Sequence, residues 1–250
     1  RNMMIEDEDP FHMDRIQDEQ RRRNRMARGC WELYAAHRQR VTELLLARHS
    51  ADGCTQDHGQ PASRLCVLGA GNCNDLDLPR LLTGFREVHL VDLDGEALSA
   101  GVAAQDLAAD ARLHLHAGVD VTGVSSRLSD WTCDRPPCAA DVDAVLAAAA
   151  AEADLPLDGP FDVVASVCLL SQLLEAVKLA LGETHSQYLP LVQAVRGRHL
   201  RQAVQLCRSG GRLVIVTDFV SSDTCRDLAT VAEAQLPALA EQLVLAQNFF

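Results

Sequence analysis

Residues 64–75 read Arg-Leu-Cys-Val-Leu-Gly-Ala-Gly-Asn-Cys-Asn-Asp, and this stretch decides the fold. It begins with a short apolar run, which predicts a buried strand. The two glycines that follow, Gly69 and Gly71, allow a sharp backbone turn and a close approach of another group to the chain. The stretch therefore predicts a strand that ends in a tight glycine turn.

Strands and helices alternate along the chain after this turn. We expect strands at 64–71, 87–94, 112–120, 161–170 and 210–220. We expect helices at 75–85, 95–109, 141–154, 185–207 and 223–247, the last of them bent at Pro237. Apolar strands that alternate with helices predict an α/β fold, in which a doubly wound parallel sheet carries helices on both faces.

The segment before the turn has a different character. Residues 11–49 place Leu, Val and Met at helical spacing, so we expect helix there, broken in two at Gly29. Residues 50–63 are polar and rich in Gly, Asp and Ser, which predicts a loop. We therefore divide the chain into an N-terminal helical extension at 1–58 and a core at 59–250.

The composition limits the classes of function. The chain has 250 residues, 48% of them hydrophobic, and a formal net charge of −12. Such a chain can bury a core, and its acidic body disfavours binding to nucleic acid phosphates. No apolar window is long enough to span a bilayer, and the first residues lack the apolar stretch of a signal peptide. We expect a cytoplasmic protein without nucleic acid or membrane partners, and its oligomeric state stays open.

The cysteines and histidines predict no metal site. Nine cysteines are an odd number, which fits reduced thiols better than a disulfide framework. Cys133 and Cys138 have no second pair at the spacing of a zinc site. His114 and His116 alternate, so they would share one face of a strand.

An acidic residue follows the glycine turn at a spacing that is typical of a cofactor site. Asp92 ends the second predicted strand, about twenty residues after the glycines, and this spacing suits a carboxylate that binds the ribose hydroxyls of an adenosine cofactor. A dinucleotide site would need a third glycine where this chain has Asn74, and Asp75 would repel a diphosphate. S-adenosylmethionine has no phosphate and carries two cationic groups, so nearby carboxylates suit it. The alternative is that no cofactor binds here, and that the glycines only form a turn while Asp92 is a solvated loop acid.

Five segments resemble, in order, the motifs of the class I S-adenosylmethionine-dependent methyltransferases, which have a Rossmann-like fold. The likeness covers roughly residues 60–220. Its segments are RLCVLGAGNCND at 64–75, VHLVDLD at 88–94, LHLHAGVDVTG at 113–123, PFDVVASVCLLSQL at 160–173 and CRSGGRLVIVTDF at 207–219.

The resemblance implies S-adenosyl-L-methionine as the cofactor. Asp92 would bind the ribose, and Leu93 would lie beside the adenine. Asp120 would meet the adenine amino group, and Val121 would pack on the ring. The other implied cofactor-binding residues are Gly69, Ala70, Gly71, Asn72, Asp75 and Ser166.

The chain also departs from the family. Cys73 stands where a glycine is frequent, and Val67 stands where the first strand often carries an acid, for which Asp75 would compensate. The family's sheet continues with a sixth and a seventh strand, so we expect the last one or two strands to be missing.

The resemblance implies methyl transfer to an acceptor, for which we expect a small molecule. The family has no universal catalytic residue, so the catalytic residues stay open; candidates are Ser171, Gln172, His185, Tyr188 and Asp218. Trp31, Tyr34 and His37 would cover the acceptor as part of a lid, or simply pack. Two alternatives remain: a non-catalytic protein that binds S-adenosylmethionine or a partner, and an NAD-dependent oxidoreductase.

Overall fold

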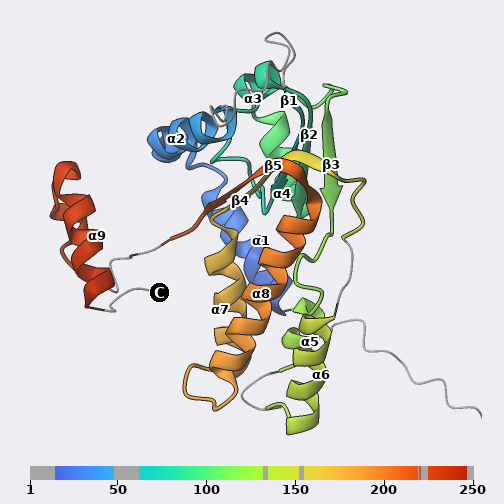
Figure 1. The fold of residues 1–250 in the computed structure, drawn as a ribbon, viewed down its shortest axis with the longest axis vertical. Helices are drawn as coiled ribbons and strands as arrows, with labels where there is room; N and C mark the ends of the chain where they lie inside the picture. Colours follow the sequence, from blue (N-terminus) through green and yellow to red (C-terminus); the bar gives the residue numbers. More distant parts are fainter. Residues whose placement is uncertain are drawn as a thin grey trace, which may run out of the picture.

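A parallel sheet of five strands forms the centre of the protein (Figure 1). The computed structural model describes residues 15–47, 62–131, 135–151, 155–218, 220 and 225–246. The strands lie in the order β3-β2-β1-β4-β5, and all four pairings are parallel. They are β1 (Ala62–Leu68), β2 (Phe85–Asp92), β3 (Leu113–Ala117), β4 (Phe161–Val167) and β5 (Cys207–Val216).

The strand order reverses between β1 and β4, where the chain crosses from one half of the sheet to the other. Such a switch point opens a crevice at the carboxyl ends of the strands. The predicted doubly wound α/β fold is therefore confirmed.

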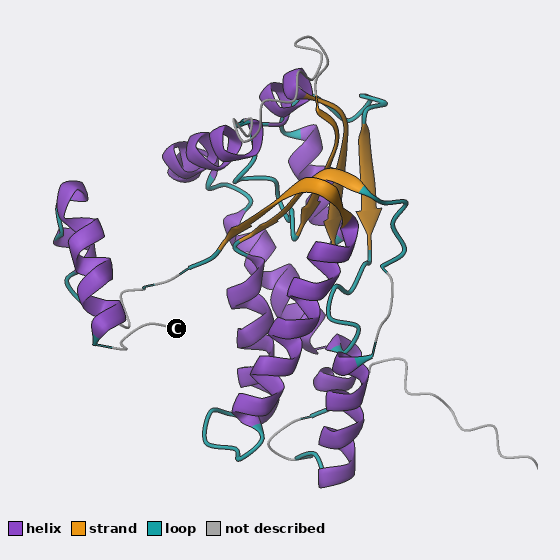
Figure 2. Cartoon of the chain, in the orientation of Figure 1, coloured by secondary structure: helices purple, strands orange, loops and turns teal. Residues whose placement is uncertain are grey.

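Helices surround the sheet and extend beyond its carboxyl edge (Figure 2). The α-helices are α1 (Arg15–Ala27), α2 (Ala35–Leu46), α3 (Leu78–Gly84), α4 (Gly95–Ala103), α5 (Ser125–Ser129), α6 (Ala139–Ala150), α7 (Leu169–Leu181), α8 (Tyr188–Leu206) and α9 (Leu236–Leu245). Short 3₁₀ helices occupy η1 (Trp31–Tyr34), η2 (Leu228–Thr230) and η3 (Glu233–Gln235).

Both faces of the central strand β1 are buried from Leu65 to Leu68, which explains why β1 is apolar at successive positions. Leu65 and Val67 belong to the core that the sheet shares with α2, α3 and α4. Cys66 and Leu68 point the other way, into a core that includes Phe161. A third core lies among the helices α1 and α5 to α8, beyond the carboxyl edge (Figure 1).

The structure confirms the break in the N-terminal helix and corrects the end of the fourth strand. The chain turns at residues 28–29 between α1 and η1, as predicted for Gly29. The fourth strand ends at Val167 rather than 170, because Cys168 takes a left-handed conformation (φ 52°) and α7 begins at Leu169. The predicted loop at 50–63 and the division at residue 58 fall mostly or wholly outside the described residues.

The continuous helix predicted at 223–247 is wrong. Two short 3₁₀ turns come first, and α9 begins only at Leu236. Pro237 lies in the first turn of α9 rather than in a bend, and a proline is tolerated there because that N–H would have no partner in the helix. Helix α9 stands apart from the sheet (Figure 1). In the part of the chain that the structure describes, no helix is both long and apolar enough to cross a membrane.

Candidate functional site

The glycine turn after β1 docks on the end of β2. Gly69 and Gly71 both have positive φ values, of 76° and 47°. The Gly69 and Ala70 amides donate hydrogen bonds to the Val91 carbonyl, at 2.8 and 3.1 Å. A side chain at position 69 would also collide, because its Cβ would lie 2.8 Å from the Cβ of Leu169. The glycine is therefore needed both for the turn and for the packing of α7.

Asp92 is held by the backbone at the end of β2. Its Oδ2 accepts a hydrogen bond from the Gly71 amide at 2.8 Å, and its Oδ1 accepts one from the Asp94 amide at 2.8 Å. The residue is only 4% exposed, and burial raises the pKa of its carboxyl above the usual range. Two amides thus fix the orientation of a carboxylate whose remaining lone pairs can accept further donors.

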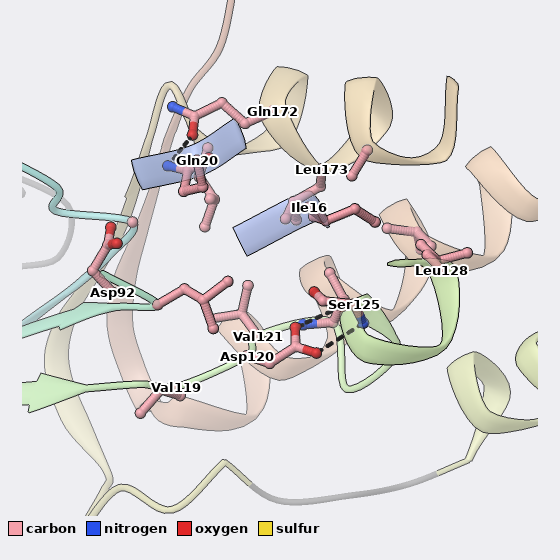
Figure 3. Close-up of a pocket in the computed structure, with 16 residues that line it drawn as sticks. Ile16, Gln20, Asp92, Val119, Asp120, Val121, Ser125, Leu128, Gln172 and Leu173 are labelled. Atoms are coloured by element: carbon pink, nitrogen blue, oxygen red, sulfur yellow. Dashed lines mark hydrogen bonds between the residues drawn. The ribbon is translucent and has the colours of Figure 1, made fainter. Parts of the chain in front are cut away.

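A small cavity lies in front of Asp92, of about 50 Å³. Five of the sequence-predicted residues line it, namely Gly69, Asp92, Leu93, Asp120 and Val121. Figure 3 shows Asp92 and Val121 on one side, with Ile16 and Gln20 of α1 on the other. The sequence analysis missed Ile16 and Gln20, since no pattern within α1 indicates what it covers.

Asp120 organises the loop that follows β3. Its carboxylate accepts hydrogen bonds from the Thr122 amide at 2.8 Å, the Thr122 hydroxyl at 2.6 Å and the Ser125 amide at 2.9 Å (Figure 3). These contacts start α5 and hold Val121, which is 6% exposed, against the cavity.

Helix α1 is fastened across the glycine turn by side-chain amides. Asn72 donates to the Asn24 carbonyl at 2.6 Å, and Asn74 donates to the Ala27 carbonyl at 2.8 Å. Further along α1, Gln20 donates to the Gln172 side chain of α7 at 2.6 Å. The helical extension therefore closes over the cavity.

Two side-chain oxygens in the glycine loop are buried without a hydrogen-bond donor among the described residues, Asn72 Oδ1 and Asp75 Oδ1. Asp75 Oδ1 lies 3.2 Å from His37 Nε2, a distance that suits an ion pair but without hydrogen-bond alignment. Burial raises the pKa of Asp75, and the facing His37 opposes that shift. Within the described part of the chain, Asn72 Oδ1 thus lacks a donor, and Asp75 Oδ1 faces only the His37 ring.

A second hollow, of about 390 Å³, opens at the ends of β4 and β5 on the other side of the start of α7. His37, Cys168 and Asp218 line it together with apolar residues of α9. The Ser171 hydroxyl donates to Asp218 Oδ2 at 2.7 Å, and Cys168 Sγ lies 3.9 Å from His37 Nε2.

The other candidate residues lie in different parts of the structure. Gln172 lines the first cavity, whereas His185 and Tyr188 lie at the turn between α7 and α8, far from the sheet (Figure 1). Trp31 stacks on the Arg38 guanidinium, 3.4 Å from the ring centroid. Ser166 is fully buried, and its hydroxyl lies 2.9 Å from His199 Nε2, away from both hollows.

Comparisons with known proteins give likenesses to solved structures alone. No family model matches the chain, and no curated protein matches it. An S-adenosylmethionine-dependent methyltransferase from Clostridium acetobutylicum ATCC 824 is 16% identical, with a TM-score of 0.33; the match covers 62% of this chain and 43% of that one.

The N-methyltransferase NodS from Bradyrhizobium japonicum WM9, in complex with S-adenosyl-L-homocysteine, is 13% identical, with a TM-score of 0.40, over 82% of this chain and 72% of that one. A ribosomal protein L11 methylase from Lactobacillus delbrueckii subsp. bulgaricus is 16% identical, with a TM-score of 0.29, over 64% and 67% of the two chains. Likenesses this weak carry no argument about activity, so the function is argued from the described residues.

Proposed function

We propose that this protein binds S-adenosyl-L-methionine at the carboxyl edge of β1 and β2 and transfers its methyl group to a small molecule. The observation that carries the proposal is Asp92, a buried carboxylate oriented by two backbone amides and facing a cavity at the switch point of the sheet. In this position the carboxylate would accept hydrogen bonds from the two ribose hydroxyls.

The glycine loop fits a cation better than a diphosphate. The amides of Gly69, Ala70 and Gly71 already donate to Val91 and Asp92, and the Cys73 amide donates to the Ala70 carbonyl. A diphosphate needs such amides as donors. The buried oxygens of Asn72 and Asp75 instead make no aligned hydrogen bond among the described residues, so an ammonium group of S-adenosylmethionine that reached them would be stabilised. This disfavours an NAD-dependent oxidoreductase.

The apolar lining would hold the adenine. Leu93 and Val121 line the same cavity as Asp92, and an adenine packed against them would be removed from water. With Asp92 on the ribose and Asp75 near the ammonium, the methyl group would face the start of α7. There the two hollows adjoin, since Leu169 lines the first and Cys168 the second.

The cofactor supplies an activated methyl group and a good leaving group, the neutral thioether. The residues of this chain would therefore act chiefly by placing the acceptor in line with the methyl group and excluding water. His37 lines the second hollow, and its Nε2 lies 3.2 Å from Asp75 Oδ1. The acidic Asp218 in the same hollow favours an acceptor with a donor or cationic group.

Helix α1 would have to move for the cofactor to enter. Pockets for such ligands have volumes of roughly 300–1,000 Å³, whereas the cavity in front of Asp92 measures about 50 Å³. Ile16 and Gln20 of α1 line that cavity, so an outward movement of this one helix would enlarge it. The helical extension would thus serve as a lid on the cofactor.

Calorimetry with S-adenosylmethionine, S-adenosylhomocysteine and NAD tests the proposed cofactor. We expect saturable binding of the first two ligands and no binding of NAD. Binding of NAD alone would overturn the proposal. Transfer of a labelled methyl group to a panel of amines, phenols and thiols then tests the activity. Binding without transfer would favour the non-catalytic alternative, a protein that binds S-adenosylmethionine or a partner.

A further inference from the structure

A cluster of three histidines and one glutamate lies on the sheet, away from both hollows. Glu87 and His89 come from β2, and His114 and His116 come from β3. The register places His89 opposite His114 and Val91 opposite His116, and alternate residues of a strand share a face. The ring centroids of His89 and His114 are 4.4 Å apart, and those of His89 and His116 are 5.2 Å apart.

The contacts of His89 allow two tautomers. Its Nε2 lies 3.4 Å from the Arg64 guanidinium, which can only donate, and 3.6 Å from Glu87 Oε2. Its Nδ1 lies 3.0 Å from His116 Nε2. In the tautomer with the proton on Nδ1, that nitrogen donates to His116, and the Nε2 lone pair faces the Glu87 carboxylate. The Arg64 guanidinium is the cation that now lies beside both acceptors.

We propose that Glu87, His89 and His114 form a binding site for a divalent transition metal ion of the zinc type. One ligand atom from each of the three residues lies within 4.8 Å of the others. Zinc binds histidine nitrogens and carboxylate oxygens at about 2.0–2.2 Å, so donors around one ion are roughly 3.3–3.6 Å apart. The pair Glu87–His89 already has this separation, at 3.6 Å, and the ligand atom of His114 lies within 4.8 Å of both.

The surroundings of His89 suit a ligand. A metal-bound histidine commonly donates its other ring N–H to an acceptor that holds its orientation, and His116 fills this role.

The Arg64 guanidinium would compete with a metal ion for Glu87 and His89. Its guanidinium now serves as the cation, with Nε 3.1 Å from Glu87 Oε2. The same side chain also contacts the Pro160 carbonyl at 3.2 Å and lies over the Phe161 ring at 4.6 Å. These two contacts give Arg64 a place to remain when an ion displaces it from Glu87. The site is reached from the sheet edge, because β3 is the outermost strand on this side and Glu87 is 30% exposed.

The site would clip the edge strand β3 to β2 and is separate from the proposed cofactor site. His89 precedes Asp92 by three residues, so the two side chains leave β2 on opposite faces. Sequence analysis placed His114 and His116 on one face, which the structure confirms, but it could not supply Glu87 and His89, since they come from the neighbouring strand.

The test uses tag-free protein stripped of metal with a chelator. Co²⁺ is titrated and followed by visible absorption, and Zn²⁺ affinity is measured by competition with a chromophoric chelator. We expect one ion per chain and a higher unfolding temperature with Zn²⁺. His114→Ala and Glu87→Gln should each weaken binding at least 10-fold, and His116→Ala about 10-fold or more through lost orientation of His89. His185→Ala, in the turn between α7 and α8, is the matched control and should bind like the wild type.

Arg64→Met distinguishes this site from a cluster that merely packs. Because it removes the rival cation and keeps an aliphatic stem over Phe161, Zn²⁺ should bind several-fold more tightly. The proposal is overturned if the wild type takes up no ion, if His114→Ala binds as well as the wild type, or if Arg64→Met weakens binding. Should His114→Ala fail to fold by circular dichroism, the wild-type stoichiometry and Arg64→Met still decide the question.

Discussion

The two halves of the sheet's carboxyl edge are built differently. At the β1–β2 half the loop amides are paired with Val91 and Asp92, and Asp92 is 4% exposed. At the β4–β5 half every residue of β5 is at least partly exposed, and Asp218 is open to solvent. The first half is preformed, whereas the second is open. This difference fits a fixed cofactor beside an acceptor region whose chemistry the fold does not dictate.

A substitution that introduces a steric clash behind the glycine loop should cause the largest loss of stability. Gly101 of α4 packs so closely that an added Cβ would collide with the backbone carbonyl of Asn72. We expect Gly101→Ala to lower the free energy of unfolding by about 3 kcal/mol, since overpacking against backbone is hard to relieve. Urea denaturation measures this loss.

The matched control for that variant is Gly29→Ala, because an added Cβ at Gly29 meets no atom within 4 Å among the described residues. Its stability should stay near that of the wild type. Equal losses in the two variants would show that the glycine loop is not tightly packed.

A fall in pH should change the stability contributed by His199 and by Asp92 in opposite directions. Burial lowers the pKa of His199, behind β4, to about 4, so the unfolded chain takes up the proton more readily. The stability that His199 contributes is present above pH 6.5 and is lost as the pH falls toward 4, by about 2–3 kcal/mol. The raised pKa of Asp92 has the opposite sign: its contribution is greatest at low pH and is lost as the pH rises.

Urea titrations at several pH values check this expectation. His199→Gln keeps a partner for the Ser166 hydroxyl and should flatten the loss of stability between pH 6.5 and 4. The remaining slope belongs partly to His89, whose pKa is also lowered to about 4, chiefly by burial. An unchanged slope in His199→Gln would contradict the assignment to His199.

Removing a hydrogen bond that holds α1 on the glycine loop should lower stability by less than the changes above. Asn74→Ala removes the hydrogen bond to the Ala27 carbonyl, and we expect a loss of about 1 kcal/mol. Because α1 closes the cavity, the variant should bind S-adenosylmethionine with a faster association rate and should be cleaved more readily by protease within α1. Stopped-flow fluorescence and limited proteolysis measure the two effects. Unchanged rates in both would argue against a lid.

Loss of the exposed ion pair beside α1 should have the smallest effect on stability. The Arg28–Glu96 ion pair joins the turn after α1 to α4, at 2.9 Å, but both side chains are exposed. Exposed pairs contribute little, so Arg28→Ala should change stability by less than about 0.5 kcal/mol. A loss larger than that of Asn74→Ala would mean that charge rather than the side-chain amides holds the lid.

Much of the sheet could be predicted from the sequence, because its signals are local. The apolar run that becomes β1, the glycines after it and Asp92 after β2 each follow from residues close together in the chain. The five strands were all found for this reason. The last helix was misjudged since Pro237 fits either a bend or a helix start, and only the packing context decides between them.

The contacts across the site could not be predicted. Asn72 and Asn74 find their partners in α1, 47 to 48 residues away, and no local pattern indicates such a pairing. The resemblance implies Ser166 as a cofactor contact, and no local pattern indicates that its hydroxyl lies 2.9 Å from His199 Nε2.

Calorimetry of S-adenosylmethionine binding to Asp92→Ala tests the central claim most directly. Glu96→Ala is the control, because Glu96 is an exposed acid on the neighbouring helix, with 76% of its side chain accessible. We expect Asp92→Ala to weaken binding by about 2 kcal/mol, roughly 30-fold, through the loss of a charge-assisted hydrogen bond to the ribose, and Glu96→Ala to bind like the wild type. Equal affinity in Asp92→Ala and the wild type would contradict the assignment of this edge of the sheet to the cofactor.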